Sequence, residues 1–341
     1  MKHLEILAAT AQEMVLPGKG ILAADESFPT IEKRFAAHSI ATSEKNRHDY
    51  RTLLVTTPGL GKYISGVILF DETLRQEADP GISIPEALGQ RGIIPGIKVD
   101  CGLAPLPSFP GESYTQGLDR LSTRLSEYEK LGARFTKWRA VINIGDGLPT
   151  SVGITNNART LALFAGMSQA AGLVPIVEPE VLMTGDHTLE RCEEVTTATL
   201  QSVFDALSEY RVAFEGMLLK TSMVLPGQSC IDQSNTERIA QSTLRCLNRA
   251  VPAAVPGILF LSGGQSEIEA TERLNAICDG ADVPWALSIS FGRALQATAL
   301  ALWKGQSRNT DIAQEALLHR AHCNSRAMSG SYSSADETAH S

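Results

Sequence analysis

Eight short apolar runs recur along this chain, and each passes into polar or charged residues at or near its C-terminal end. They cover residues 18–24, 63–70, 92–99, 133–142, 173–177, 217–219, 257–261 and 285–291. Their ends fall roughly 30 to 45 residues apart, which is the spacing of successive strand–helix units. Runs this short are typical of buried strands. The pattern therefore favours a parallel sheet that is covered by helices.

The segments between these runs have apolar residues at helical spacing. Helices are predicted over residues 116–130, 156–171, 196–210, 237–250 and 266–278, with Thr115 as N-cap of the first. Strand–helix alternation repeated eight times predicts an α/β protein, a single-domain (β/α)8 TIM barrel over residues 1–326. An amphipathic helix over 1–15 should precede it, and a flexible Ser-, Ala- and Gly-rich tail over 327–341 should follow. An open doubly wound sheet is the alternative, but no Gly-x-Gly-x-x-Gly follows the first strand.

Composition narrows the partners of the chain. The 341 residues carry a net charge of −8, which argues against a nucleic-acid or anionic-membrane partner. A phosphorylated substrate stays open, because a few cations in one cleft can outweigh an acidic surface. The six cysteines are scattered, the first helix carries Glu5 and Glu13 unlike a signal peptide, and no apolar run reaches membrane-spanning length. We expect a cytoplasmic protein without disulfides.

A lysine interrupts the sixth apolar run. Lys220 follows Met217–Leu219 in a segment bounded by Gly216 and Pro226. Burial disfavours the ammonium form, so such a lysine loses its proton more easily and becomes a nucleophilic amine. The functional interpretation is a Schiff-base lysine that attacks a carbonyl group. The structural interpretation is a lysine at a strand end whose ammonium group reaches water.

Further charged residues stand at the ends of the other predicted strands. Barrel enzymes bind and convert their substrates at the C-terminal face, so these residues should converge there. Any single one could be a strand-end ion pair, but charges on successive strands indicate a site. Cations around Lys220 would repel its proton, and the carboxylates could act as general acids and bases. The set consists of Asp25, Glu178, Glu180, Lys98, Lys137, Lys220, Arg139 and Arg293.

Small residues after strands seven and eight predict a phosphate cradle. Ser262-Gly263-Gly264 and Gly292-Arg293 would let backbone N–H groups approach an anion that the arginine also binds. Lys33-Arg34 after strand one could hold a second anionic group, or could belong to a solvated helix face. The seven histidines show no paired ligand spacing at a strand end. No metal and no cofactor are expected.

Several longer segments resemble class I fructose-1,6-bisphosphate aldolases, over roughly residues 10 to 330. The matching segments appear in the order that the family has. They are Gly-Lys-Gly-Ile-Leu-Ala-Ala-Asp-Glu-Ser (18–27), Gly-Ile-Lys-Val-Asp (96–100), Thr-Gln-Gly-Leu-Asp (115–119), Lys-Trp-Arg (137–139), Pro-Ile-Val-Glu-Pro-Glu (175–180), Leu-Leu-Lys (218–220), Phe-Leu-Ser-Gly-Gly-Gln-Ser (260–266) and Gly-Arg-Ala-Leu-Gln-Ala (292–297).

The resemblance implies reversible cleavage of fructose 1,6-bisphosphate to dihydroxyacetone phosphate and glyceraldehyde 3-phosphate, by a homotetramer. It implies that Lys220 forms the imine, that Glu178 and Lys137 assist, and that Asp25 positions the hydroxyl where the carbon–carbon bond breaks. Glu180 joins this catalytic set. The substrate-binding residues implied by the resemblance are Ser262, Gly263, Gly292 and Arg293 at the ketose-side phosphate, and Lys33, Arg34, Lys98 and Arg139 at the other end.

The chain departs from the family pattern in three places. Thr221-Ser222 follows Lys220 where Pro-Asn is usual, and Phe28-Pro29 stands where Thr-Gly is usual. The terminal tyrosine of animal members is missing, since the chain ends Ala-His-Ser. Two alternatives therefore stay open. The substrate could be another sugar phosphate, such as fructose 1-phosphate or sedoheptulose 1,7-bisphosphate, or the chain could be a catalytically silent barrel scaffold.

Overall fold

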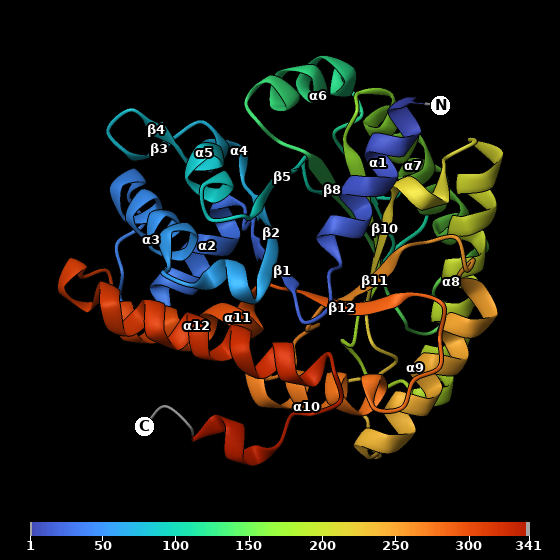
Figure 1. Cartoon of the computed structure of the whole chain (residues 1–341). Helices are drawn as coiled ribbons and strands as arrows, with labels where there is room; N and C mark the ends of the chain where they lie inside the picture. The colour runs from blue at the N-terminus through green and yellow to red at the C-terminus, as the bar shows by residue number, and fades with distance from the viewer. Residues whose placement is uncertain (1, 339–341) are drawn as a thin grey trace.

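A closed barrel of eight parallel strands forms the centre of the molecule in the computed structural model, which describes residues 2–338 (Figure 1). Around the barrel the strands follow the order β1-β12-β11-β10-β9-β8-β5-β2. The predicted TIM barrel is therefore confirmed. Its strands are β1 (Gly20–Ala24), β2 (Ile64–Leu69), β5 (Ile94–Lys98), β8 (Phe135–Ile142), β9 (Val174–Val181), β10 (Leu218–Thr221), β11 (Gly257–Phe260) and β12 (Ala286–Phe291).

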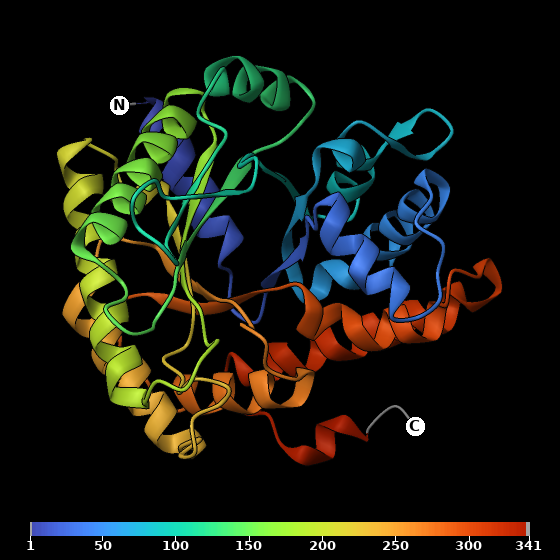
Figure 2. The same cartoon turned by 180° about the vertical axis from the view of Figure 1, so that it is seen from behind.

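Helices surround these strands on the outside, as the two opposite views show (Figures 1 and 2). The α-helices are α1 (Lys2–Met14), α2 (Phe28–Ala36), α3 (Glu44–Thr56), α4 (Asp71–Leu74), α5 (Ile84–Gly89), α6 (Leu121–Lys130), α7 (Ser151–Ala170), α8 (Leu189–Glu209), α9 (Thr236–Ala250), α10 (Glu267–Cys278), α11 (Arg293–Trp303) and α12 (Thr310–Ala327). Four short 3₁₀ helices are η1 (Leu60–Lys62), η2 (Phe214–Gly216), η3 (Ser307–Asn309) and η4 (Ser334–Glu337). Two small hairpins pair β3 (Glu77–Asp79) with β4 (Ile82–Ser83) and β6 (Leu103–Pro105) with β7 (Ser113–Thr115).

The barrel strands are apolar along most of their length because both of their faces are covered. Strand β8 shows how the two faces differ. Trp138 points outward and stacks on Phe164 of α7, with ring centroids 5.4 Å apart. Lys137 and Arg139 are each one residue away, so they point to the opposite side, into the barrel. Alternation along one strand thus supplies both core packing and polar groups for the interior.

Helix α1 closes the N-terminal end of the barrel. Its residues Leu7, Ala11 and Met14 are buried in one apolar cluster with residues of the barrel strands, Phe135 at the start of β8 among them. Ser65 at the start of β2 donates a hydrogen bond from its hydroxyl to the Met14 carbonyl at 2.5 Å. The predicted N-terminal helix is therefore present, and it seals the end of the barrel that lies opposite the charged strand ends.

Three predicted helix starts differ from the structure. The helix expected from residue 116 begins at Leu121, and Thr115 is not its N-cap. Thr115 ends β7 instead, where its hydroxyl donates to the Arg139 carbonyl at 2.7 Å, and the positive φ of 121° at Gly117 excludes helical backbone. Helices α7 and α8 start several residues earlier than predicted, because Thr150 and Thr188 cap them with their side chains.

The described end of the chain returns along α10 and α12. The Tyr332 backbone N–H donates to Asn275 Oδ1 of α10 at 2.9 Å, and its hydroxyl donates to Glu337 Oε1 at 2.6 Å. Glu337 also forms an ion pair with Arg320, a buried residue of α12. The flexibility of the tail over 327–341 and the domain boundary after residue 326 stay predictions, and residues 339–341 lie outside the described part.

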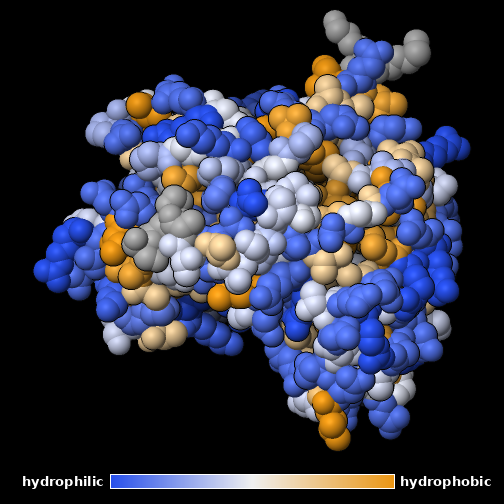
Figure 3. Space-filling model, turned by 60° about the horizontal axis from the view of Figure 1, so that its bottom comes forward, coloured by the Kyte–Doolittle hydropathy of each residue, from blue (hydrophilic) through white to orange (hydrophobic). Residues whose placement is uncertain are grey.

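The surface is mainly polar. On the face that Figure 3 presents, hydrophilic side chains predominate and apolar ones form small separate patches. Among the described residues, no helix combines the length and the apolar character that crossing a membrane requires. All six cysteines are free thiols.

Candidate active site

One cavity of about 1280 Å³ lies at the C-terminal ends of the barrel strands. Every residue predicted for the site lines it: Asp25, Lys33, Arg34, Lys98, Lys137, Arg139, Glu178, Glu180, Lys220, Ser262, Gly263, Gly292 and Arg293. They come from seven of the eight barrel strands or from the loops and helices that directly follow them, β2 being the exception. The barrel thus brings together residues that lie up to 268 positions apart (293 − 25) in the chain.

Three buried charges and the partly buried Asp25 form a continuous chain across the floor of this cavity. The Lys220 ammonium group on β10 lies 3.0 Å from Glu178 Oε1 on β9. Glu178 Oε2 lies 3.2 Å from Lys137 Nζ on β8, and Lys137 Nζ lies 2.7 Å from Asp25 Oδ2 beyond β1. The ion-pair partner of Lys220 is therefore one of the carboxylates that the sequence predicted for this site. Lys220 is 4% exposed and Glu178 is 3% exposed, so water screens these contacts weakly.

The lysines fix the charge state of both carboxylates. Burial alone would raise the pKa of Asp25, but the charges of Lys137, Lys220 and Lys98 outweigh it and hold this pKa well below its usual range. The pKa of Glu178 is lowered in the same way, with burial opposed by Lys137, Lys220 and Arg139. Burial would lower the pKa of Lys137, yet Asp25 and Glu178 raise it above the ordinary value. The resting site therefore holds two carboxylates and a protonated Lys137.

Two further ion pairs flank this chain of charges. Lys98 Nζ at the end of β5 lies 2.6 Å from Asp100 Oδ1 and donates to the Asp100 carbonyl at 2.8 Å. Arg139 on β8 donates from Nε to Glu180 Oε2 on the neighbouring strand. Burial would lower the pKa of Arg139, but Glu180 raises it. Both cations are therefore neutralised in the resting site and would have to share or exchange partners with an incoming anion.

A separate network positions Arg34 at the rim of the cavity. The buried Glu26 carboxylate forms ion pairs with Arg34 of α2 and with Arg51 of α3. Arg51 Nη2 also donates to the Glu26 carbonyl at 3.2 Å. Lys33, one residue before Arg34, is exposed and forms no ion pair with the residues that the structure describes. The rim thus presents one fixed guanidinium and one free ammonium group.

The loop after β11 and the start of α11 form another part of the rim. Gly263 and Gly264 have positive φ values of 54° and 95°, which glycine adopts without strain. A side chain at Gly264 would stand 3.6 Å from Arg293 Nη2, so the guanidinium lies directly over this loop. Within residues 2–338, Arg293 has no ion-pair partner. Backbone N–H groups and an available guanidinium in one place are what an anion-binding site requires.

Sequence reasoning missed two residues that hold the site together. Asp100 directly follows the third predicted strand, and its spacing of two from Lys98 was the signal that the two would pair. Arg51 lies within a helix whose pattern gave no sign of function, and only its burial with Glu26 reveals its role. Both act on the side chains around the cavity, through Lys98 and Arg34.

Comparison with known proteins agrees with this geometry. The model of the family described as "Glycolytic: Fructose-bisphosphate aldolase class-I" matches residues 6–341. A probable fructose-bisphosphate aldolase class 1 from Xanthomonas campestris is 52% identical over 330 residues, covering 96% of this chain and 99% of the relative. The fructose-bisphosphate aldolase of Dictyostelium discoideum is 48% identical over 99% of this chain and 95% of its own length.

A solved structure gives the same result for the fold. The fructose-bisphosphate aldolase of Plasmodium falciparum, crystallised with TRAP and a small-molecule inhibitor, superposes with a TM-score of 0.96 at 49% identity. The match covers 97% of this chain and 96% of that one. The chain therefore belongs to the class-I fructose-bisphosphate aldolases, lyases that split fructose 1,6-bisphosphate reversibly into dihydroxyacetone phosphate and glyceraldehyde 3-phosphate through a lysine Schiff base.

Proposed function

We propose that Lys220 is the residue that forms the Schiff base in this reaction. The observation that carries the assignment is the position of its amine, buried at the centre of the cavity and 3.0 Å from a carboxylate that can take its proton. Lys98 and Lys137 also line the cavity, but each contacts an aspartate at 2.7 Å or less. Lys220 has only Glu178, which can also return the proton.

The neighbours of Lys220 supply the proton transfers that imine chemistry needs. Glu178 accepts a proton from the Lys220 ammonium, so that the free amine can attack the ketone carbon of the sugar. The carbinolamine then loses its hydroxyl group as water when Glu178 gives the proton back. Lys137, 3.2 Å from Glu178, stabilises the carboxylate form of Glu178 before it takes up the proton and after it returns it. The imine finally withdraws electrons from the carbon–carbon bond that breaks.

Asp25 is placed for the cleavage step itself. Its carboxylate contacts Lys137 on the side away from Glu178, and its lowered pKa keeps it ionised at neutral pH. An ionised carboxylate can orient the substrate hydroxyl and accept its proton as that carbon becomes the aldehyde. Glu180 contacts Arg139 and orients that guanidinium toward the same part of the cavity.

The distribution of cations supports a substrate with a phosphate at each end. Arg34 lies beside Gly292 and the start of α11, since a side chain at Gly292 would stand 3.7 Å from Arg34 Nη2, and Arg293 and the Gly263–Gly264 loop belong to the same side of the cavity. Lys98 and Arg139 lie on β5 and β8, across the closed barrel from β12. Ser262, which is 8% exposed, and Gly292 border the first of these groups of cations, and Lys33 follows β1 next to Arg34. Two separated anion sites fit a bisphosphate better than a sugar with a single phosphate.

Borohydride trapping tests the assignment of Lys220. Reduction in the presence of dihydroxyacetone phosphate should convert the imine into a stable secondary amine, so that the peptide containing Lys220 gains the mass of the reduced three-carbon fragment. Peptide mass spectrometry after digestion locates the adduct. An adduct on Lys98 or Lys137, with none on Lys220, would show that another lysine is the nucleophile.

Arg293 is expected to bind the phosphate next to the imine. Arg293→Ala should weaken binding of dihydroxyacetone phosphate about 10-fold or more, because it removes a charge-assisted and potentially bidentate contact. Arg293→Lys should recover only part of the loss, since a lysine offers a single point charge. Titration calorimetry measures both constants, with Arg308→Ala as a control at an exposed arginine outside the cavity. Unchanged affinity in both Arg293 variants would place the phosphate elsewhere.

The proposed oligomeric state rests on the family, and the proposed location in the cell rests on the free thiols. Members of the family are commonly homotetramers, and we extend this oligomeric state to the present chain. Light scattering measures the mass of the assembly in solution, and the mass of a single chain would contradict the proposal. The free cysteines fit a reducing compartment such as the cytoplasm. Fractionation of the cells that produce the protein measures its location, and finding the protein secreted would contradict the cytoplasmic assignment.

A further inference from the structure

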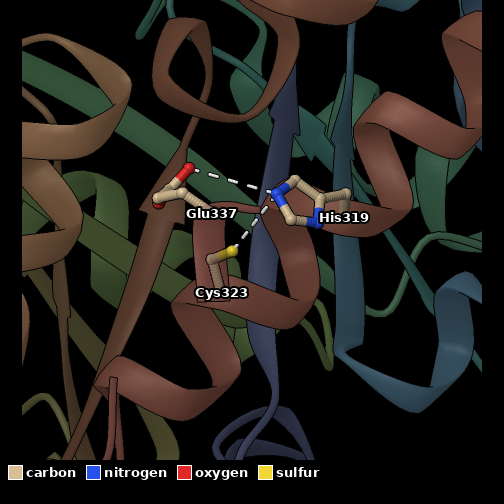
Figure 4. A group of neighbouring side chains, drawn as sticks. All are labelled: His319, Cys323 and Glu337. Atoms are coloured by element: carbon tan, nitrogen blue, oxygen red, sulfur yellow. Dashed lines mark hydrogen bonds and ion pairs between the residues drawn. The ribbon is translucent and has the colours of Figure 1, made fainter. Parts of the chain in front are cut away.

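Three possible metal ligands meet where the end of the chain packs on α12. His319 and Cys323 stand one helical turn apart on α12, and Glu337 reaches them from η4 (Figure 4). Their ligand atoms all lie within 4.8 Å of one another. None of the three lines the cavity that contains Lys220. This His–Cys–Glu cluster is thus separate from the aldolase site.

The spacing of the ligand atoms is close to that of a tetrahedral zinc site. Cys323 Sγ lies 3.6 Å from His319 Nε2, and Glu337 Oε2 lies 4.0 Å from the same nitrogen. A tetrahedral ion with a Zn–N bond of about 2.05 Å and a Zn–S bond of about 2.3 Å places nitrogen and sulfur about 3.5 Å apart. The His–Cys pair therefore already has the required separation, and the carboxylate oxygen at 4.0 Å from the nitrogen has to approach to about 3.4 Å, the nitrogen–oxygen distance in such a site.

Neighbouring groups hold the carboxylate in place. Glu337 Oε1 accepts from the Tyr332 hydroxyl at 2.6 Å and from Arg320 Nη1 at 2.6 Å, while Oε2 accepts from the same Arg320 nitrogen. Each carboxylate oxygen has room for about two partners, so Oε2, the oxygen nearest to His319, keeps one position for a metal. Hydrogen-bonded carboxylates of this kind are usual around protein-bound metals, where the outer partners orient the ligand. Arg320 costs some affinity by charge repulsion, which the thiolate and carboxylate charges offset.

We propose that His319, Cys323 and Glu337 bind a zinc ion, with water at the fourth position. The residue types fit a borderline-soft ion, since they supply one imidazole, one thiolate and one carboxylate. Cys323 is buried, whereas the side chains of His319 and Glu337 are 17% and 21% exposed, so the ion can reach the site from solvent. Binding releases the thiol proton to solvent, because the thiolate is the form that coordinates.

The ion would fasten the end of the chain to the barrel. Two ligands belong to α12 and the third to η4, so a bound zinc ion would link segments that otherwise hold together through Arg320, Tyr332 and Asn275. Any ligand that binds the folded arrangement alone also stabilises it. The site thus controls how firmly the residues after α12 are docked, separately from the imine chemistry.

Metal titration of the full-length, tag-free chain tests this proposal. The protein is first stripped with a chelator, and Zn²⁺ is then titrated in competition with a chromophoric chelator. Co²⁺ is used as a spectroscopic probe, because a thiolate ligand produces a charge-transfer absorption that oxygen and nitrogen ligands do not. We expect one Zn²⁺ per chain, a thiolate–Co²⁺ band, and affinity lowered at least about 100-fold in Cys323→Ser. Cys278→Ser, a cysteine of α10 outside the cluster, should bind as the native chain does.

Stability and activity measurements complete the test. Zn²⁺ should raise the Tm of the native chain and of Cys278→Ser but not that of Cys323→Ser, while aldol cleavage by the stripped chain stays unchanged. Absence of Zn²⁺ binding by the native chain, or equal affinity in Cys323→Ser, would overturn the proposal. If Cys323→Ser does not fold, His319→Gln and Glu337→Gln are titrated instead, and native-like affinity in both overturns it equally.

Discussion

Replacing Lys220 by methionine is expected to abolish aldol cleavage, with kcat lowered about 10⁴-fold or more. Without the amine no imine can form, and the neighbouring carboxylates have no covalent intermediate on which to act. Methionine fills a similar volume, and Glu178 keeps its contact with Lys137 at 3.2 Å, so the carboxylate is not left buried without a partner. The variant should therefore fold and still bind sugar phosphates.

Steady-state kinetics measures the loss of kcat in Lys220→Met, and borohydride trapping measures the loss of the imine. Lys33→Met is the matched control, because it removes a lysine of the same cavity that is exposed at the rim. It should raise KM for the bisphosphate but leave the trapped adduct in place. Residual trapping in Lys220→Met at the level of the native chain would transfer the role of nucleophile to another lysine.

Replacing Lys137 by methionine should damage both catalysis and stability. The change leaves Asp25 without its contact at 2.7 Å and Glu178 with Lys220 alone. We expect kcat to fall by about 10²- to 10⁴-fold, the range of general acid–base contributions. The free energy of unfolding at pH 7 should fall by about 3–5 kcal/mol, the usual effect of breaking a buried ion pair from one side.

The stability loss should depend on pH in a defined direction. The folded-state pKa of Asp25 is lowered, so its contribution is complete above about pH 4, the ordinary value, and is lost as pH falls through the folded value. The folded-state pKa of Lys137 is raised, so its contribution is complete below about pH 10 and is lost as pH rises through the folded value. The native chain thus has its full advantage between these limits.

Urea unfolding at pH 7 and below pH 4 compares the two chains. In Lys137→Met, Asp25 can take up a proton once the pH is low, so the difference in unfolding free energy should shrink on acidification. The double variant Asp25→Asn, Lys137→Met carries neither charge, and it should regain part of the stability but none of the activity. A difference that stays constant with pH would mean that the loss comes from packing.

The barrel and the residues of its site could be predicted from the sequence, because buried strands have a recognisable local pattern of residues. A strand covered on both faces must be apolar, so a charged residue such as Lys137 or Lys220 within one stands out. Since parallel strands end at one face of a barrel, these residues were expected to converge, and they line one cavity. The start of α6 was predicted wrongly, because Thr115 forms a tertiary contact with β8 in place of a local cap.

Pairings between distant segments could not be predicted in the same way. The contact of Glu26 with Arg51 joins the end of a strand to a helix, and no spacing in the sequence encodes it. His319 and Cys323 lie four residues apart, a spacing visible in the sequence, but two ligands on one helix do not by themselves indicate a metal site. Glu337 joins them only because the chain turns back along α12, which depends on the contacts of Tyr332 and Arg320.

The closure of the barrel by α1 has a kinetic consequence. Leu7 and Met14 pack with strand side chains such as Phe135 in one buried cluster, so the N-terminal end of the barrel is filled and the cavity opens at the C-terminal ends of the strands. The sugar, both products and the water that hydrolyses the imine must all pass through the same opening. Because these molecules share one opening, the release of a product and the binding of the next substrate molecule are coupled events. Residues far from any reacting atom thereby confine the exchange of substrate, products and water to the C-terminal face of the barrel.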